Sequence, residues 1–483
     1  MSIGRNTAYN LIGFAIPTVL GLVAVPLYLD LIGPARFGVM ALAWLVLGYF
    51  GLFDLGLGRA TAQRIAAASD DDDATRRILA TSLLANLVIG LAAGALLYPV
   101  ARYLFAQVFD LPPGLRGEVL RAVPLLALAL PAATTVGVLG GALMGRGRFR
   151  QSNAISVVST TLFQFLPLAV AWANGPDLVP VMAAAIIARL LGAGLLWRCC
   201  RRTFGTLGPA DADRRELRPL MAFGGWVTVA SLIGPLMVFF DRFLIGALLG
   251  PVAVTIYTVP MDAMRRLTGA ALALANSLFP RFAIARDDEA RRLSRDAIAI
   301  LYAIFTPGTG AALVAMDPAM RIWLGDPIGG QAAPLARLFL IATWMNCFAQ
   351  IPFTRLQASG QPDRIARLLM LEVPFYLAAL WLALVHHGLA GAAWVFLVRI
   401  AMDALALAWL AQRRINHGKT IAATAMLFCG AALALERLPP LSVGQAVGWA
   451  TLAGLVLLWP AWRIAPAAIT ERSVEAMRAV RLR

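Results

Sequence analysis

Several charged side chains of this sequence lie inside long apolar segments, where they could do chemistry. Residues 252–280 form one such segment, which carries Asp262, Arg265 and Arg266 near its centre. On a helix, spacings of three and four residues would put Asp262 beside both arginines, so an ion pair could form there. Two guanidinium groups against one carboxylate leave a positive excess. A guanidinium is a planar, permanently charged fork that matches phosphate oxygens, so the pattern favours an anion site.

Other charges in apolar segments form a second set of candidates. Arg399 and Asp403 also stand four residues apart, whereas Asp241 and Arg242 are adjacent and must point to different faces of a helix. A charge at the centre of a membrane is costly and marks a functional site by default. The alternative is that these groups form internal salt bridges that join helices. Arg59 and Arg189 could instead extend toward the membrane surface. The candidate anion-binding residues are therefore Arg265, Arg266, Arg242, Arg399, Arg59 and Asn10.

The elements that position these residues must be membrane-spanning, because the composition is unlike that of a soluble protein. Of the 483 residues, 60% are hydrophobic and 14% are charged, against about 25% charged in soluble proteins. The net charge is +16. The basic residues fall in short clusters between apolar runs rather than in one polar domain, which argues against a nucleic-acid partner and for basic loops beside a membrane.

The chain contains fourteen apolar runs of roughly the 20 residues that a transmembrane helix needs. They predict an all-α integral membrane protein. The runs are 8–30, 37–58, 78–101, 119–143, 152–173, 177–197, 220–248, 252–280, 296–316, 334–354, 366–385, 389–411, 420–436 and 443–462.

The distribution of basic residues predicts the orientation. With fourteen spans, the segments on the side of the termini hold 30 of the 42 basic residues, and the opposite loops hold seven, Arg337 among them. The positive-inside rule therefore predicts both termini in the cytoplasm. The acidic run Asp70 to Asp73 is interpreted as a solvated loop.

The sequence repeats weakly, which predicts two parallel halves. LIGPA at Leu31 to Ala35 is similar to LLGPVA at Leu248 to Ala253, and MGRGRFRQSNA from Met144 is similar to LQASGQPDRIA from Leu356. Six predicted spans separate the two members of each pair. We therefore predict a first lobe at 1–215, a second lobe at 216–415, and two further helices with a basic tail at 416–483.

No pattern for metal, nucleotide or catalytic chemistry emerges from the sequence. The four cysteines lack zinc-ligand spacing and are interpreted as reduced structural residues. Lys419 is the sole lysine, and the residue that should be glycine in a Walker A motif is Arg413. The three histidines form no site, and no outer loop has room for a catalytic domain. The expectation is a protein without cofactor or metal that is not an enzyme.

Four short motifs resemble those of bacterial polysaccharide flippases, which belong to the multidrug/oligosaccharidyl-lipid/polysaccharide exporter superfamily. They are LIGPARFGV from Leu31, FDLGLGRATAQ from Phe53, DRFLIGALLGPVAVTIYTVP from Asp241 and LQASGQPDR from Leu356. The resemblance implies two six-helix lobes in pseudo-symmetric repeat around a V-shaped cavity, plus two C-terminal helices. It also implies an inner-membrane protein that moves undecaprenyl-pyrophosphate-linked oligosaccharides by alternating access.

Carried onto this sequence, the resemblance assigns the pyrophosphate contact best to Arg265 and Arg266. Coupling to a proton or sodium gradient would then involve acids, and the candidates are Asp241, Asp262, Glu372 and Asp403. The implied partners are the lipid-linked oligosaccharide, membrane lipid, and a polysaccharide polymerase with its export machinery.

Three alternatives stay open at this point. A cation-coupled multidrug antiporter of the same fold should present a negative cavity, whereas the excess here is arginine. A membrane polysaccharide polymerase or ligase should carry a large outer loop, which this chain lacks. A structural membrane scaffold would leave the buried charges without a purpose.

Overall fold

The structure is a computed structural model that describes residues 3–51, 56–68, 71–208, 211–213, 215–217, 220, 240–412 and 417–464. The side chains of residues 3–17, 51 and 412 are outside this description. The described chain is helical and packs as two compact units, Met1–Thr255 and Ile256–Arg483.

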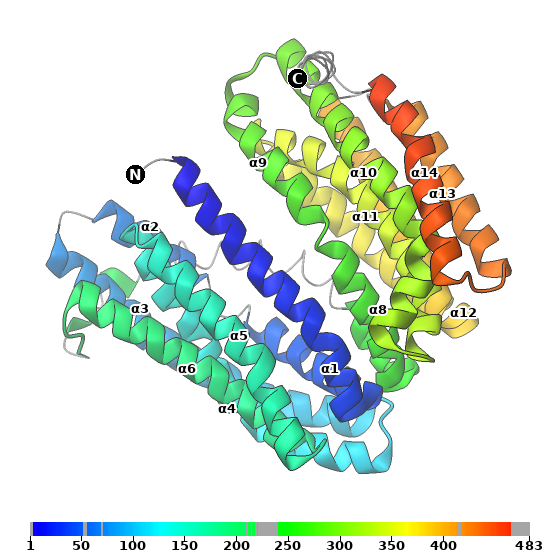
Figure 1. Cartoon of the computed structure of the whole chain (residues 1–483). Helices are drawn as coiled ribbons and strands as arrows, with labels where there is room; N and C mark the ends of the chain where they lie inside the picture. The colour runs from blue at the N-terminus through cyan, green and yellow to red at the C-terminus, as the bar shows by residue number, and fades with distance from the viewer. Residues whose placement is uncertain are drawn as a thin grey trace, which may run out of the picture. The chain divides into compact units, whose positions relative to one another are not determined.

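Besides residues 240–255, which are mostly helical, the described part of the first unit contains six α-helices and a short π-helical turn (Figure 1). They are α1 (Ile3–Gly51), α2 (Leu57–Ala67), α3 (Asp72–Tyr103), η2 (Leu104–Val108), α4 (Pro113–Gly145), α5 (Phe149–Asn174) and α6 (Leu178–Phe204). α4 packs against α2, α3 and α6, and α5 lies between α1 and α6. The core of the α2, α3, α4 and α6 bundle includes the fully buried side chains of Leu57, Leu79 and Val138.

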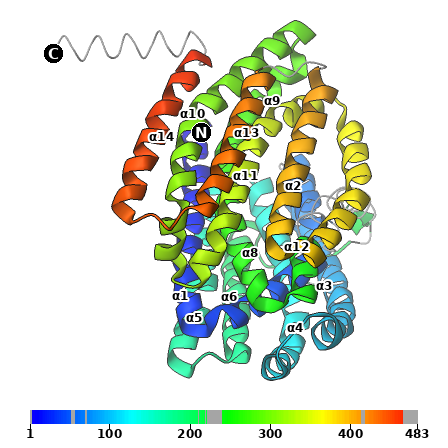
Figure 2. The same ribbon diagram turned by 90° about the vertical axis from the view of Figure 1, so that its right-hand side faces the viewer.

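The second unit is built around α11. Its helices are α8 (Gly250–Arg265, which begins in the first unit), α9 (Thr268–Ile284), α10 (Asp287–Leu324), α11 (Ile328–Ala358), α12 (Pro362–Gln412), α13 (Gly418–Arg437) and α14 (Val443–Ile464). In the apolar window of α11, 83% of the residues are buried, which identifies it as the central helix. α10 packs against both α11 and α14 (Figure 2).

Polar groups of the second core are satisfied inside it. The indole N–H of Trp344 on α11 donates to the hydroxyl of Thr306 on α10 at 3.0 Å. The hydroxyls of Tyr302 on α10 and Thr424 on α13 lie 2.7 Å apart. Because a buried tryptophan or tyrosine needs a hydrogen-bond partner, these contacts determine how α10, α11 and α13 are aligned.

Eleven helices of the described residues are long and apolar enough to cross a membrane, so the chain is a multi-pass membrane protein. Two of them hold two predicted spans each. α1 bends at Gly33 (φ 78°, ψ 162°) and α12 bends at Gly388 (φ 57°, ψ −144°), and both conformations favour glycine. The predicted seventh span lies mostly outside the described residues. The prediction of an all-α membrane fold is thereby confirmed.

The repeated motifs have matching backbone conformations in the two halves. Gly33 and Gly250 have φ of 78° and 77°, and Gly147 and Gly360 have φ of 71° and 72°. Both members of the second pair end a helix in a Schellman motif. In the first half the Arg148 N–H donates to the Leu143 carbonyl, and in the second the Gln361 N–H donates to the Leu356 carbonyl. The weak sequence repeat therefore corresponds to a repeat of local structure.

Three features differ from the sequence-based expectation. The acidic run is not only a loop, because the Asp71 carboxylate caps α3 by accepting from the Ala74 N–H at 2.8 Å, and Asp72 and Asp73 lie in the first turn. Arg337 is not a loop residue, because α11 already begins at Ile328. The predicted eighth span is one apolar segment, Gly250–Ile284, but a turn at Arg266 and Leu267 divides its helix into α8 and α9.

Candidate functional site

The turn that interrupts the eighth span lies at the arginine pair that the sequence singled out. α8 ends at Arg265 and α9 begins at Thr268. The Leu267 N–H donates to the Met264 carbonyl at 3.0 Å, which is a tight turn rather than α-helical pairing. Arg265 is exposed on its unit, while Arg266 and Asp262 are half-buried. Two arginines that are adjacent in the chain thus lie at a turn inside a membrane span.

A second charged cluster forms within α12. Beyond the bend at Gly388, the chain returns, so Glu372 of the first half interacts electrostatically with both Arg399 and Asp403 of the second half. The guanidinium of Arg399 stacks over the ring of Tyr376 at 5.1 Å and over that of Phe396 at 5.6 Å. The sequence paired Arg399 with Asp403 by spacing, and the bend adds Glu372 and Tyr376.

This α12 cluster has two carboxyls for one guanidinium. The buried oxygens Glu372 Oε2 and Asp403 Oδ1 have no hydrogen-bond partner within the described part of the chain. A buried acceptor without a partner is costly and calls for a donor or a cation. When both carboxyls are ionised, one positive charge is missing, and a proton or a small cation would supply it. The cluster therefore has the composition of an ion-binding site.

The candidates of the first unit are arranged differently. Asp241 is fully buried and its Oδ1 accepts from the Arg242 backbone N–H at 2.7 Å, whereas the Arg242 side chain is half-exposed. The two adjacent side chains thus point to different environments, as their spacing predicts. Arg59 is exposed on α2. The side chain of Asn10 is not among those that the structure describes.

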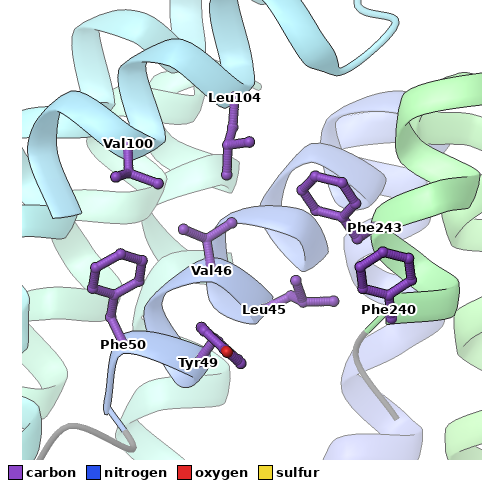
Figure 3. Close-up of a pocket in the computed structure, with 8 residues that line it drawn as sticks. All are labelled: Leu45, Val46, Tyr49, Phe50, Val100, Leu104, Phe240 and Phe243. Atoms are coloured by element: carbon purple, nitrogen blue, oxygen red, sulfur yellow. The ribbon is translucent and has the colours of Figure 1, made fainter. Parts of the chain in front are cut away.

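Beside Asp241 lies an apolar pocket of about 330 Å³. Figure 3 shows side chains of α1, of the α3–η2 segment and of the described helical residues 240–248 converging on it. Its lining is Leu45, Val46, Tyr49, Phe50, Val100, Leu104, Phe240 and Phe243. Since no charged side chain lines it, this pocket suits a hydrocarbon chain and cannot be the anion site.

Two arginines have surroundings that sequence reasoning missed. Arg189 was placed at a span end, yet it lies in the middle of α6, with its guanidinium 4.7 Å from the Phe163 ring and 5.5 Å from the Trp44 ring. Arg337 is only 5% exposed and its Nε donates to the Leu313 carbonyl at 3.3 Å. The position of Arg189 deep in its span can be read from the sequence. Its contacts with Trp44 and Phe163 cannot, because these residues lie on two other helices.

The described residues contain no group of three or more histidine, cysteine, aspartate or glutamate side chains that could hold a metal ion.

Comparison with known proteins identifies the relatives of this chain. Residues 3–285 match the family model described as polysaccharide biosynthesis protein. A curated protein of Shigella flexneri named "Putative O-antigen transporter" is 28% identical over 414 residues, which cover 86% of this chain and 98% of the relative.

Solved structures of two kinds share the fold. An inward-facing multidrug resistance MATE family transporter of the MOP superfamily superposes with a TM-score of 0.68 at 16% identity, covering 86% of this chain and 99% of that one. The lipid II flippase MurJ in an inward closed conformation superposes with a TM-score of 0.73 at 9% identity, covering 97% and 99%. At these identities the likeness is one of fold.

Proposed function

This chain belongs to the polysaccharide biosynthesis protein family, and we propose that it is a flippase that moves lipid-linked oligosaccharides across a bacterial inner membrane. Its curated relative is named for O-antigen transport, and one of the solved structures that share its fold is a lipid II flippase. On this proposal the chain is a transporter and not an enzyme. The substrate is an undecaprenyl-pyrophosphate-linked repeat unit of O-antigen or exopolysaccharide.

The observation that carries the proposal is the arginine pair at the helix break. Arg265 is the last residue of α8 and Arg266 lies in the turn before α9, inside a largely apolar span that also carries Asp262. Broken helices at membrane depth are typical of binding sites in transporters. Two adjacent guanidinium groups suit the two phosphates of a pyrophosphate head group, because each can bind oxygens bidentately. Arg242, Arg399, Arg59 and Asn10 are further candidates for this contact.

Ion coupling is proposed for the α12 cluster. Glu372 and Asp403 together carry one negative charge more than Arg399 can neutralise. Uptake of a proton or sodium ion would neutralise the excess negative charge of the cluster. This change in charge would favour one of the two conformations between which an alternating-access transporter switches. Asp241 and Asp262 are the other candidate acids.

The proposed topology follows from the charges. Both termini lie in the cytoplasm, and the repeats at 1–215 and 216–415 act as the two lobes of an alternating-access transporter. Residues 416–483 add two helices and the basic tail. A polysaccharide polymerase and export machinery are the proposed protein partners.

The test is deletion of the gene in its host, followed by complementation with variants. Deletion is expected to abolish surface polymer and to leave lipid-linked repeat units on the cytoplasmic leaflet. The double variant Arg265→Ala/Arg266→Ala is expected to reach the wild-type protein level without restoring polymer. The matched control is Arg291→Ala/Arg292→Ala, an adjacent pair exposed near the start of α10, which should complement fully.

Normal polymer after deletion, in a host without a second flippase, would refute the proposed function and make drug efflux the next assay. Full complementation by Arg265→Ala/Arg266→Ala would keep the function and move the anion site to another of the candidate arginines.

A further inference from the structure

The first unit contains a cavity that the proposed anion site does not use. Its volume is about 470 Å³, within the range of roughly 300–1,000 Å³ that ligand pockets have. It lies between α4, α5 and α6, and we call it the hydroxyl cavity. The residues that define its chemistry are Ser152, Ser156, Ser159 and Thr160 of α5, Gly140 of α4 and Arg189 of α6.

One wall of the hydroxyl cavity is a row of hydroxyl groups. Ser152, Ser156, Ser159 and Thr160 are spaced by four, three and one residues, which places them on one face of α5. The buried Oγ of Ser159 has no hydrogen-bond partner among the described residues. Serine hydroxyls in helices usually bond to a carbonyl of the preceding turn. The Ser159 hydroxyl, which packs against Gly192 of α6, thus leaves a hydrogen bond unmade in this wall. The hydroxyls of Ser152, Ser156 and Thr160 line the same cavity and are the ones offered to a ligand.

The opposite wall leaves open space in front of these hydroxyls. A Cβ atom added to Gly140 of α4 would meet nothing within 4 Å. Glycines at helix crossings normally allow close packing, as at Gly141, where a Cβ would lie 2.1 Å from the Gly58 carbonyl oxygen. Gly140 therefore widens the cavity rather than tightening a helix contact.

One end of the hydroxyl cavity holds a single cation, Arg189. The Arg189 guanidinium is stacked on Phe163 at 4.7 Å and on Trp44 at 5.5 Å. Rings over a guanidinium cover its faces, so its N–H groups are offered at its edge. No described carboxylate lies within salt-bridge distance of Arg189, and its buried Nε has no hydrogen-bond partner in the described chain. A partly desolvated cation of this kind attracts an oxyanion.

The other end of the cavity, near Met144, Ser152 and Leu196, has a basic rim. The turn between α4 and α5 and the last turns of α6 lie together there, because Arg146 stacks over the Phe204 ring at 5.6 Å and Cys199 Sγ contacts Gln151 Oε1 at 3.5 Å. The rim residues are Arg146, which pairs with Asp72, and Arg148, Arg150, Arg198, Arg201 and Arg202. Charges of one sign at the mouth of a cleft raise the local concentration of an oppositely charged ligand.

We propose that the hydroxyl cavity binds a saccharide of the transported lipid, with an oxyanion of that saccharide held by Arg189. This inference rests on the proposed function, and it assigns to the first unit a carbohydrate subsite separate from the arginine pair of the second unit. A row of hydroxyls suits sugar hydroxyls, which donate and accept hydrogen bonds. One guanidinium suits one oxyanion, which can be the carboxylate of an acidic sugar or a phosphate attached to a sugar.

The first experiment measures binding to the purified full-length protein in lipid nanodiscs by saturation-transfer NMR. The probes are glucuronate, glucose 1-phosphate, glucose and inorganic pyrophosphate. We expect glucuronate, glucose 1-phosphate or both to bind, and to bind at least about tenfold more weakly to Arg189→Leu, the loss that removing one charged hydrogen-bonded contact gives. Binding of glucuronate would identify the oxyanion as a carboxylate, and binding of glucose 1-phosphate would identify it as a phosphate. Equal binding of glucose, preference for pyrophosphate, or no binding of any probe would overturn the proposal.

A plug variant tests the place of binding. Gly140→Leu puts a side chain into the open space of the cavity, and Gly448→Leu, on α14, is the matched control because a Cβ there also meets nothing within 4 Å. We expect Gly140→Leu to weaken probe binding at least about tenfold, and Gly448→Leu to bind like the wild type. Unchanged binding to Gly140→Leu would refute the assignment to this cavity.

Complementation separates this inference from the proposed function. In a strain whose deletion removes the polymer, Gly140→Leu should restore little of it at the wild-type protein level, while Gly448→Leu restores it fully. If the deletion leaves polymer intact, the proposed function fails. If the deletion strain makes no polymer and Gly140→Leu restores it fully, the proposed function stands and the carbohydrate subsite is refuted.

Discussion

Gly38 of α1 crosses the backbone of Pro251 so closely that a Cβ atom on Gly38 would lie 1.8 Å from the Pro251 carbonyl oxygen. Gly38 follows the first of the repeated LIGPA-like motifs and Pro251 lies within the second. The Thr255 hydroxyl donates to the Pro34 carbonyl at 2.7 Å in the same place. We expect Gly38→Ala to destabilise the protein by about 3 kcal/mol or more, because the helices must separate. Thermal unfolding in detergent, followed by tryptophan fluorescence, measures this.

The control for Gly38 lies on the same helix. A Cβ on Gly48 would meet nothing within 4 Å, so Gly48→Ala should be neutral or stabilising by up to about 1 kcal/mol through helix propensity. Equal unfolding temperatures of the two variants would contradict the close crossing.

Arg36 and Glu118 form a bidentate ion pair between the bend of α1 and the start of α4, with Nε–Oε2 and NH2–Oε1 distances of 3.0 and 2.7 Å. Both side chains are partly buried. We expect a double-mutant cycle with Arg36→Gln and Glu118→Gln to give a coupling of about 1–2 kcal/mol, more than an exposed pair gives. Arg367 and Asp363, an exposed i,i+4 pair on α12, are the control. A coupling no larger than theirs would show that the bidentate geometry adds nothing.

The α12 cluster predicts the ion dependence of transport. Glu372→Gln and Asp403→Asn keep size and remove the charges that a proton or cation would neutralise. If the cluster couples transport to an ion gradient, each variant should lose the gradient-driven component of flipping while still binding substrate. Flipping of a fluorescent lipid-linked saccharide in proteoliposomes, with and without an imposed gradient, measures this. Glu289→Gln, in the exposed first turn of α10, should keep the dependence.

His417 predicts a loss of stability at mildly acidic pH. Burial first, and then the nearby charge of Arg295, lower the pKa of His417 below its ordinary value of 6.5, against the opposite effect of Asp296. The unfolded chain thus takes up the proton before the folded protein does, so stability falls as the pH drops below about 6.5. His417→Asn, which tolerates the left-handed φ of 54°, should flatten the fall in unfolding temperature between about pH 7 and pH 5. An identical pH profile would refute a role for His417.

The repeat shows how far sequence reasoning reaches in this protein. Short motifs aligned Gly33 with Gly250 and Gly147 with Gly360, and the structure gives both members of each pair nearly the same positive φ. Such agreement is expected, because a turn that needs positive φ restricts the residue type and so leaves a trace in the sequence. The turn after Arg265 could not be predicted in the same way. Pro260 and Gly269 lie on either side of it, but proline and glycine also occur in continuous membrane helices.

By itself, the sequence determined that this is a helical membrane protein, how most of its spans divide the chain, and which charges lie inside them. These follow from local properties, since apolar runs of sufficient length must be helical in a bilayer and buried charges stand out against them. Only the tertiary structure decided which charges meet. It joined Glu372 to Arg399 through the bend at Gly388 and placed Arg189 between Trp44 and Phe163. Those contacts depend on how separate helices pack, and the packing arises from many weak side-chain contacts that no single segment of sequence contains.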